Sequence, residues 1–174
     1  MLVLSLWLAS IPVGRAQTQL LLEGFEGAWP GSWSVGDDNP TGTPAYWKDV
    51  NAAFGGRAPR SGSWKGYCAG IGFAGTTAAP QYTNHMTAFM SRTINLTGQS
   101  RVNLRFWNLV PSIESNFDYC RVFLDGTLLW SNGIPRTTWT EVATNLNAFA
   151  GVNRTLRFEF FSDVTVTAEG WYLD

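Results

Sequence analysis

Two segments in the second half of the chain alternate apolar and polar side chains with a period of two residues. Residues 102–107 read Val-Asn-Leu-Arg-Phe-Trp, and residues 156–161 read Leu-Arg-Phe-Glu-Phe-Phe. This period places every second side chain on the same face of an extended backbone, which is typical of a strand with one buried face. Beyond residue 16, no stretch sustains helical periodicity for the length of a structural helix. The sequence therefore predicts an all-β fold.

Turn signals separate further apolar runs and divide the chain into short strands. Residues 119–124 lead into Asp125-Gly126, and the apolar pattern resumes at 127–130. An Asp-Gly pair between two such runs indicates a β-hairpin. Residues 139–143 form another candidate strand, and residues 146–151 are typical of a single helical turn closed by glycine. Short strands at this density predict a sandwich or a barrel.

Two apolar runs near the ends of the chain carry a carboxylate each. Residues 20–27 include Glu26, and residues 170–174 end on Asp174. The first and last strands of a β-sandwich are often neighbours, so we predict that these two runs are strands and that their acids lie close together. Between them, residues 34–66 contain Asp37-Asp38-Asn39-Pro40-Thr41-Gly42-Thr43-Pro44 and a run from Gly55 to Ser63 that is rich in Gly, Arg, Pro and Ser, and they predict long loops.

Composition limits the classes of partner. The 174 residues have a formal net charge of −1 and only 14% charged residues. This balance gives no electrostatic reason to expect nucleic acid or an anionic membrane as a partner. Nine tryptophans and eleven phenylalanines supply the volume for a two-layer core. The length predicts one domain.

Residues 1–16 are predicted to be a secretory signal peptide, which leaves 17–174 as the folded domain. The apolar run from Leu2 to Val13 is short for a membrane span. Gly14-Arg15-Ala16 places small residues at the positions that determine cleavage. No Lys or Arg precedes the run, and the alternative is a buried first helix. No later apolar stretch reaches membrane-spanning length, so we expect the mature chain to be secreted or at the cell surface.

The chain has two cysteines, Cys68 and Cys120, both in strand-like contexts. In an exported protein an even number of cysteines permits one disulfide. The alternative is two small buried hydrophobic residues, since free cysteine is among the most buried residue types. Spacing alone does not decide between them. With a single histidine besides, the two cysteines do not make a zinc site.

An ordered set of short motifs resembles the secreted bacterial jelly-roll domains called choice-of-anchor J, relatives of the cleaved-adhesin and MAM-like domains. The resemblance covers essentially the whole mature chain. The motifs are Phe25-Glu26-Gly27, Trp33-Ser34-Val35, Tyr46-Trp47, Gly62-Ser63-Trp64, Cys68-Ala69-Gly70, Tyr82-Thr83-Asn84-His85-Met86, Phe117-Asp118-Tyr119, Leu124-Asp125-Gly126, Phe160-Phe161-Ser162-Asp163 and Gly170-Trp171-Tyr172-Leu173-Asp174.

The resemblance implies an antiparallel two-sheet β-sandwich of jelly-roll type with long loops. It also implies that the last motif continues with another acid and an apolar strand, so we expect the domain to be cut short after Asp174. Domains of this kind sit inside larger exported proteins, which favours a noncatalytic adhesion or recognition module. The alternative is a carbohydrate-binding accessory domain of a secreted hydrolase or peptidase.

The resemblance further implies a calcium site. Jelly rolls of this type often bind a cation between an acid after the first strand and an acid in the last strand, positions held here by Glu26 and Asp174. Calcium prefers several oxygen ligands, so Asp37 and Asp163 are predicted to add ligands from loops, with Asp38 as a further candidate. The alternative is that Glu26 and Asp174 only cap turns or accept backbone N–H bonds.

Aromatic residues in the loop-rich segments are the candidates for ligand binding. Tyr46, Trp47 and Trp64 offer flat faces that stack on sugar rings or anchor a partner protein when they are exposed. The alternative is that they plug the ends of the sandwich. A catalytic role finds little support, because His85 has no serine or cysteine nucleophile beside it. An enzyme is therefore the third and weakest class.

Overall fold

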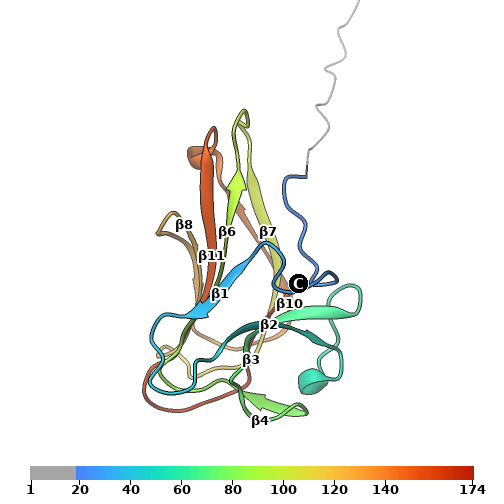
Figure 1. The fold of residues 1–174 in the computed structure, drawn as a ribbon, viewed down its shortest axis with the longest axis vertical. Helices are drawn as coiled ribbons and strands as arrows, with labels where there is room; N and C mark the ends of the chain where they lie inside the picture. The colour runs from blue at the N-terminus through green and yellow to red at the C-terminus, as the bar shows by residue number, and fades with distance from the viewer. Residues whose placement is uncertain (1–18) are drawn as a thin grey trace, which may run out of the picture.

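The computed structural model describes residues 19–174, so the predicted signal peptide at 1–16 lies outside the described residues. Two five-stranded sheets pack face to face, and every strand pair in them is antiparallel (Figure 1). Sheet A contains, in spatial order, β1 (Ser34–Asp37), β6 (Thr87–Asn95), β11 (Asn153–Phe161), β8 (Tyr119–Leu124) and β9 (Thr127–Asn132). Sheet B contains β10 (Arg136–Asn145), β7 (Asn103–Ser112), β12 (Gly170–Leu173), β3 (Trp64–Ile71) and β2 (Tyr46–Asn51). The predicted antiparallel sandwich is confirmed.

Smaller elements complete the described chain. A short hairpin is formed by β4 (Ala74–Thr76) and β5 (Ala79–Gln81), and two single 3-10 turns are η1 (Phe54–Gly56) and η2 (Asn147–Phe149). The turn η2 lies within the predicted helical turn at 146–151. Within residues 19–174, no helix is long and apolar enough to cross a membrane.

The predicted hairpin at Asp125-Gly126 is confirmed. Leu124 of β8 pairs with Thr127 of β9, and the two residues between them have φ values of 48° and 79°. Two consecutive positive φ values give a tight turn whose twist matches that of the flanking strands, which is why Asp-Gly favours this position.

Aromatic side chains from both sheets form the centre of the core. Trp171 of β12 lies 5.8 Å from Trp130 of β9 between ring centroids, and Phe106 of β7 lies 5.3 Å from Phe158 of β11. Trp171 is also 5.1 Å from Trp47 in an edge-to-face arrangement. Such pairs add to the stabilisation that the buried area of each ring provides.

Two predictions about the first third of the chain are wrong. Residues 20–27 form no strand: the Phe25 ring instead covers Gly66 of β3, where an added Cβ would lie 2.6 Å from it. Residues 34–66, predicted as loop, contain β1, β2, η1 and the start of β3. These strands are short and rich in Gly, Asp and Lys, which hides the alternating pattern.

The closing segment is a strand, as predicted, and it lies at the centre of sheet B. Leu173 pairs with Gly66 of β3 on one side and with Asn108 of β7 on the other. Asp174 continues the pairing, since its N–H and carbonyl exchange bonds of 3.1 and 2.9 Å with Trp107. Glu26 and Asp174 are thereby brought to the same loop, residues 61–64.

Candidate metal centre

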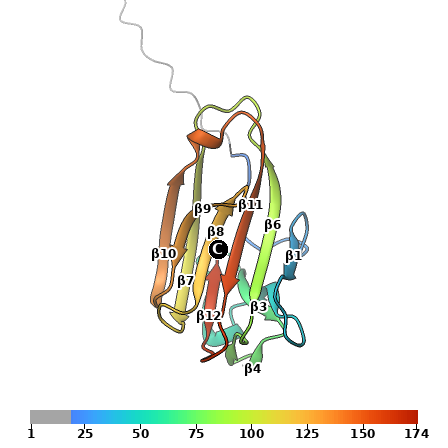
Figure 2. The same cartoon turned by 90° about the vertical axis from the view of Figure 1, so that its left-hand side faces the viewer.

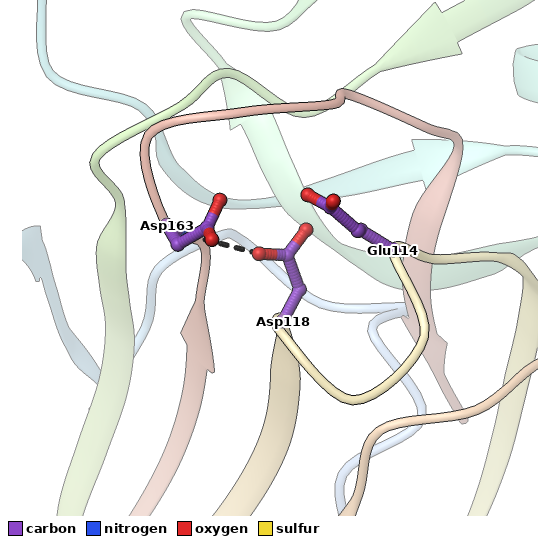
Figure 3. A group of neighbouring side chains, drawn as sticks. All are labelled: Glu114, Asp118 and Asp163. Atoms are coloured by element: carbon purple, nitrogen blue, oxygen red, sulfur yellow. Dashed lines mark hydrogen bonds between the residues drawn. The ribbon is translucent and has the colours of Figure 1, made fainter.

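Three carboxylates meet at one end of sheet A, and we call Glu114, Asp118 and Asp163 the three-acid cluster (Figure 3). Asp118 directly precedes β8 and Asp163 follows β11 by two residues. These strands pair antiparallel with Tyr119 opposite Phe161, so the residues just beyond the pair lie side by side. Glu114 comes from the loop that joins β7 to β8. One oxygen from each acid lies within 4.8 Å of the others.

Asp118 is the buried member of the cluster and has two donors of its own. The hydroxyl of Tyr82, which is also fully buried, donates to Oδ2 of Asp118. The backbone N–H of Asp163 donates to Oδ1 over 2.8 Å. The Tyr82 oxygen in turn accepts the N–H of Glu114 at 3.0 Å. This chain of bonds fixes the position of all three acids relative to Tyr82.

The other two carboxylates share one hydroxyl. Oγ1 of Thr165 lies 3.0 and 3.2 Å from the two oxygens of Glu114 and 3.1 Å from Oδ1 of Asp163. A hydroxyl carries one proton, so it satisfies only one of these oxygens at a time. Asp163 also accepts the N–H of Thr165 at 2.8 Å. For the Glu114 carboxylate, the shared hydroxyl is the only side-chain or backbone donor found among residues 19–174.

The charge of the cluster has no counterpart nearby. Within the described chain, no Lys, Arg or His nitrogen lies within 4.0 Å of any of the three carboxylates. Burial raises the pKa of Asp118 above its ordinary value, and the charges of Asp163 and Glu114 act in the same direction. Burial also raises the pKa of Tyr82, as does its bond to Asp118. A bound cation would offset both the burial and the repulsion.

The donor set fits a hard cation. All ligand atoms that the cluster offers are oxygens, from three carboxylates and the Thr165 hydroxyl. Calcium binds such sets in flexible geometry, whereas zinc and copper favour nitrogen and sulfur. The loops are held in place: the N–H groups of Phe117 and Asp118 donate to the Glu114 carbonyl, and His85 donates its N–H to the Asp163 carbonyl over 2.7 Å.

The predicted metal ligands fall into separate places. Asp163 belongs to the three-acid cluster. Asp37 lies at the end of β1 and accepts backbone N–H bonds from Asn39, Ala45 and Thr87 at 2.9–3.3 Å. Asp37 therefore ties the loop between β1 and β2 to the start of β6 and belongs to no group of three potential ligands among the described residues.

Glu26 and Asp174, here called the terminal acid pair, both hold the loop at residues 61–64. Oε1 of Glu26 accepts the N–H groups of Ser63 and Trp64 at 2.7 and 2.8 Å. Asp174 accepts the N–H of Ser61 at 2.8 Å and its hydroxyl at 3.0 Å. These contacts match the alternative to calcium binding that the sequence left open for the two acids, in which they accept backbone N–H bonds.

The predicted aromatic ligand-binding residues are largely internal. Trp47 is 0% exposed and donates its ring N–H to the Ala88 carbonyl, so the prediction that its face binds a ligand is wrong. Tyr46 is half-buried against the core, and Trp64 is 37% exposed. The Trp47 side chain faces the core because β2 is a strand of sheet B. The sequence had predicted this segment as a loop. Trp47 is instead part of the core, where its ring packs against Trp171.

The two cysteines are free and completely buried. Of the two alternatives left open by the sequence, the structure has two small buried hydrophobic residues and not a disulfide. Burial raises the pKa of both thiols, so both are neutral at physiological pH. Sγ of Cys68 in β3 accepts the N–H of Trp171 in the neighbouring strand β12 at 3.3 Å.

Sequence reasoning missed Glu114 as a site residue and treated Asp118 only as part of a motif. The signal that would have found them is the pairing of β8 with β11. Once these two strands are known to be antiparallel neighbours, Asp118 before one and Asp163 after the other must meet. Glu114 joins them through a turn closed by its own carbonyl.

No family model matches the chain. Bacillopeptidase F of Bacillus subtilis (strain 168) is 26% identical over 157 residues, which cover 78% of this chain and 11% of that protein. The chain thus spans about a tenth of the length of this curated relative.

Among solved structures, the K1 cleaved adhesin domain of Lys-gingipain from Porphyromonas gingivalis W83 superposes with a TM-score of 0.57 at 18% identity, covering 87% of this chain and 91% of that one. The K2 domain of Lys-gingipain gives 0.56 at 15% identity over 87% and 92% of the two chains. The K3 domain, also from strain W83, gives 0.51 at 17% over 90% and 95%. The chain therefore has the fold of the cleaved adhesin domains.

Proposed function

We propose that this chain is a noncatalytic adhesion or recognition module of an exported bacterial protein. The observation that carries the proposal is the agreement of the whole described sandwich with the cleaved adhesin domains of Lys-gingipain. Export rests on the predicted signal peptide at residues 1–16 and implies a secreted or cell-surface location. The ligand is then a protein or a glycan.

The chemistry of the described residues supports a noncatalytic role. A cysteine nucleophile acts as a thiolate, and burial keeps both thiols neutral. His85 has a left-handed backbone with φ of 58°, and its backbone N–H donates to the Asp163 carbonyl. Its role in the described structure is therefore to hold the loop beside the three-acid cluster. In the three-acid cluster, Asp118 is bound by Tyr82 and a backbone N–H and is enclosed in protein.

A second candidate function is a carbohydrate-binding accessory domain of a secreted hydrolase or peptidase. The observation that favours it is the relative named Bacillopeptidase F, in which the matching segment is only 11% of the length. A matching segment that leaves most of the longer protein to the rest of its chain favours an accessory role. The two candidates share the noncatalytic role and differ in ligand.

The module includes a calcium ion bound by the three-acid cluster. Three carboxylates, one of them buried, share few donors and have no positive side chain within 4.0 Å in the described chain. A divalent cation removes the repulsion and supplies each free oxygen with a partner. The loop that carries Asp163 also carries Thr165, whose hydroxyl is a further neutral ligand. Calcium binding by the terminal acid pair stays a prediction.

The noncatalytic role is tested with purified chain in calcium-containing buffer. We expect no release of product from a panel of chromogenic glycosides, esters and peptides, in contrast to saturable binding on an array of immobilised glycans and proteins. Turnover by the wild-type chain that disappears in Asp118→Asn, a variant that keeps the shape of the side chain, would contradict the proposal.

A further inference from the structure

One half-buried arginine of sheet A stands apart from the others. The half-buried arginines of the described chain are Arg92 on β6, Arg121 on β8, and Arg154 and Arg157 on β11. The last three each lie 2.7–3.5 Å from a carboxylate. Among residues 19–174, the Arg92 guanidinium has no carboxylate within 4.0 Å and lies over no aromatic ring. A cation that is partly removed from water gains stability from an acceptor, and Arg92 finds none in the described chain.

Arg92 lines a depression that lies where β1 stops covering β6. The strand β1 pairs with β6 only from Ala88 to Ser91, whereas β6 runs on to Asn95. Residues 92–95 therefore have no strand partner on that side within the described chain, and Figure 2 shows β6 continuing past β1. A turn at residues 30–33, closed by a 2.9 Å bond from the Trp33 N–H to the Pro30 carbonyl, precedes β1. The space measures about 360 Å³, and we call it the Arg92 depression.

The rest of the lining consists of hydroxyl side chains. These are Ser32, Ser34, Ser91, Thr93 and Thr155. None of the five hydroxyls forms a hydrogen bond with another residue of the described chain, although the backbone N–H of Thr155 does. Each hydroxyl therefore has a proton to donate to a ligand. No acidic side chain is part of the lining, so the depression offers one guanidinium and five hydroxyls without a negative charge of its own.

The charged groups beside the Arg92 depression compensate one another. Asp125, which accepts the Thr155 N–H at 2.7 Å, also pairs with Arg154 at 2.9 Å. Across the same sheet, two arginines and two carboxylates pair among themselves: Arg121, Arg157, Asp38 and Glu159. The positive charge of Arg92 is therefore the one that lacks a counterion here, and charge complementarity points to an anionic ligand.

We infer that the Arg92 depression binds an oxyanion, a sulfate or phosphate group carried by the ligand of the module. The fork of a guanidinium and neighbouring hydroxyls are donors that such groups accept. The donors come from β1, β6, β11 and the turn before β1, so they approach from several directions. That arrangement suits a tetrahedral group better than a planar carboxylate. The inference rests on the proposed recognition function and deepens it by naming the charged group of the ligand and its site.

The test is an NMR titration of the isotopically labelled wild-type chain with sodium sulfate and, separately, with sodium phosphate. Sodium chloride keeps the ionic strength constant, so that general screening does not change during the titration. We expect saturable shifts of the backbone N–H signals of residues 91–93 and 155 and of the Arg92 Nε–H. The ion that binds more tightly identifies the group.

Three variants locate the site. Arg92→Gln removes the charge and the fork, and we expect it to weaken binding at least about tenfold. Arg101→Gln is the matched control: Arg101 is exposed, also has no carboxylate within 4.0 Å in the described chain and does not line the depression, so affinity should stay unchanged. Thr155→Val removes one hydroxyl at an exposed position and should weaken binding about threefold. Thermal melts check that each variant keeps the fold.

Two results would overturn the inference. One is the absence of saturable shifts at residues 91–93 with both ions, and the other is an equal loss of affinity in Arg92→Gln and Arg101→Gln. Either result leaves the proposed recognition function intact, because binding on the array of glycans and proteins is measured without these ions. Conversely, oxyanion binding in a chain that binds nothing on the array would count against the proposed function alone.

Discussion

The molecule carries two groups of carboxylates that differ in the hydrogen-bond donors around them. The terminal acid pair accepts three backbone N–H groups and one hydroxyl from residues 61–64. The three-acid cluster brings three carboxylates within 4.8 Å of one another, and two of them share the single proton of Thr165. Acids at the ends of strands therefore divide into a pair that holds a loop and a cluster for which we propose a cation. Each group has four donors, which two carboxylates share in the terminal acid pair and three share in the three-acid cluster, where Glu114 has only the Thr165 hydroxyl among the described residues.

The largest effect in this comparison is expected for Asp118→Ala. The substitution leaves the N–H of Asp163 without its acceptor, and it leaves the buried hydroxyl of Tyr82 with only the long 3.5 Å bond to the Val166 carbonyl. Each unsatisfied group costs about 1–3 kcal/mol, so we expect a loss of about 4 kcal/mol in the free energy of unfolding. Urea denaturation measures it. Asp118→Asn, which keeps one acceptor oxygen, serves as the control and should lose clearly less; a loss for Asp118→Ala within the error of wild type would contradict the bonding described.

A smaller effect is expected for Glu26→Ala. The N–H groups of Ser63 and Trp64 lose their acceptor, but both bonds lie at the surface, where water replaces the carboxylate. We expect a loss of about 1 kcal/mol, and the same loss with and without calcium. Urea titrations in calcium and in chelator give the two values. A loss that appears only in calcium would show that Glu26 is a ligand and would break the comparison.

The smallest effect is a dependence on pH. Because burial raises the pKa of Asp118 in the folded state, its stabilising contribution is complete below the ordinary value near 3.8 and is lost as pH rises through the raised value. In chelator, lowering the pH from neutral should therefore stabilise wild type relative to Asp118→Asn. In calcium the sign reverses, because protonation of Asp118 releases the ion. Thermal melts over that range report both trends, and identical curves for the two proteins would contradict the assignment.

Local patterns predicted the fold well where one face of a strand is buried. The alternation at 156–161 marks β11, and the Asp-Gly pair marks the β8–β9 turn. Residues 20–27 look like a strand because they are apolar, yet they cover sheet B without pairing with it. Periodicity predicts which side chains are buried, but it does not predict which strand or loop covers them, because that depends on the tertiary fold.

The candidate site was predicted only in part for the same reason. Asp163 was singled out, whereas Glu114 and Asp118 become its neighbours only through the pairing of β8 with β11. Trp47 lies in loop-rich sequence, but its place in β2 turns it into the core.

The most direct test of the central claim is the calcium dependence of the melting temperature in three proteins. If calcium is present at about one hundred times its dissociation constant, binding adds about 2.7 kcal/mol. For a domain of this size that raises Tm by about 5–10 °C. We expect this rise in wild type and in Glu26→Gln, and its loss in Asp163→Asn. No rise in wild type, or a rise that Asp163→Asn keeps and Glu26→Gln loses, would contradict the assignment of the cation to the three-acid cluster.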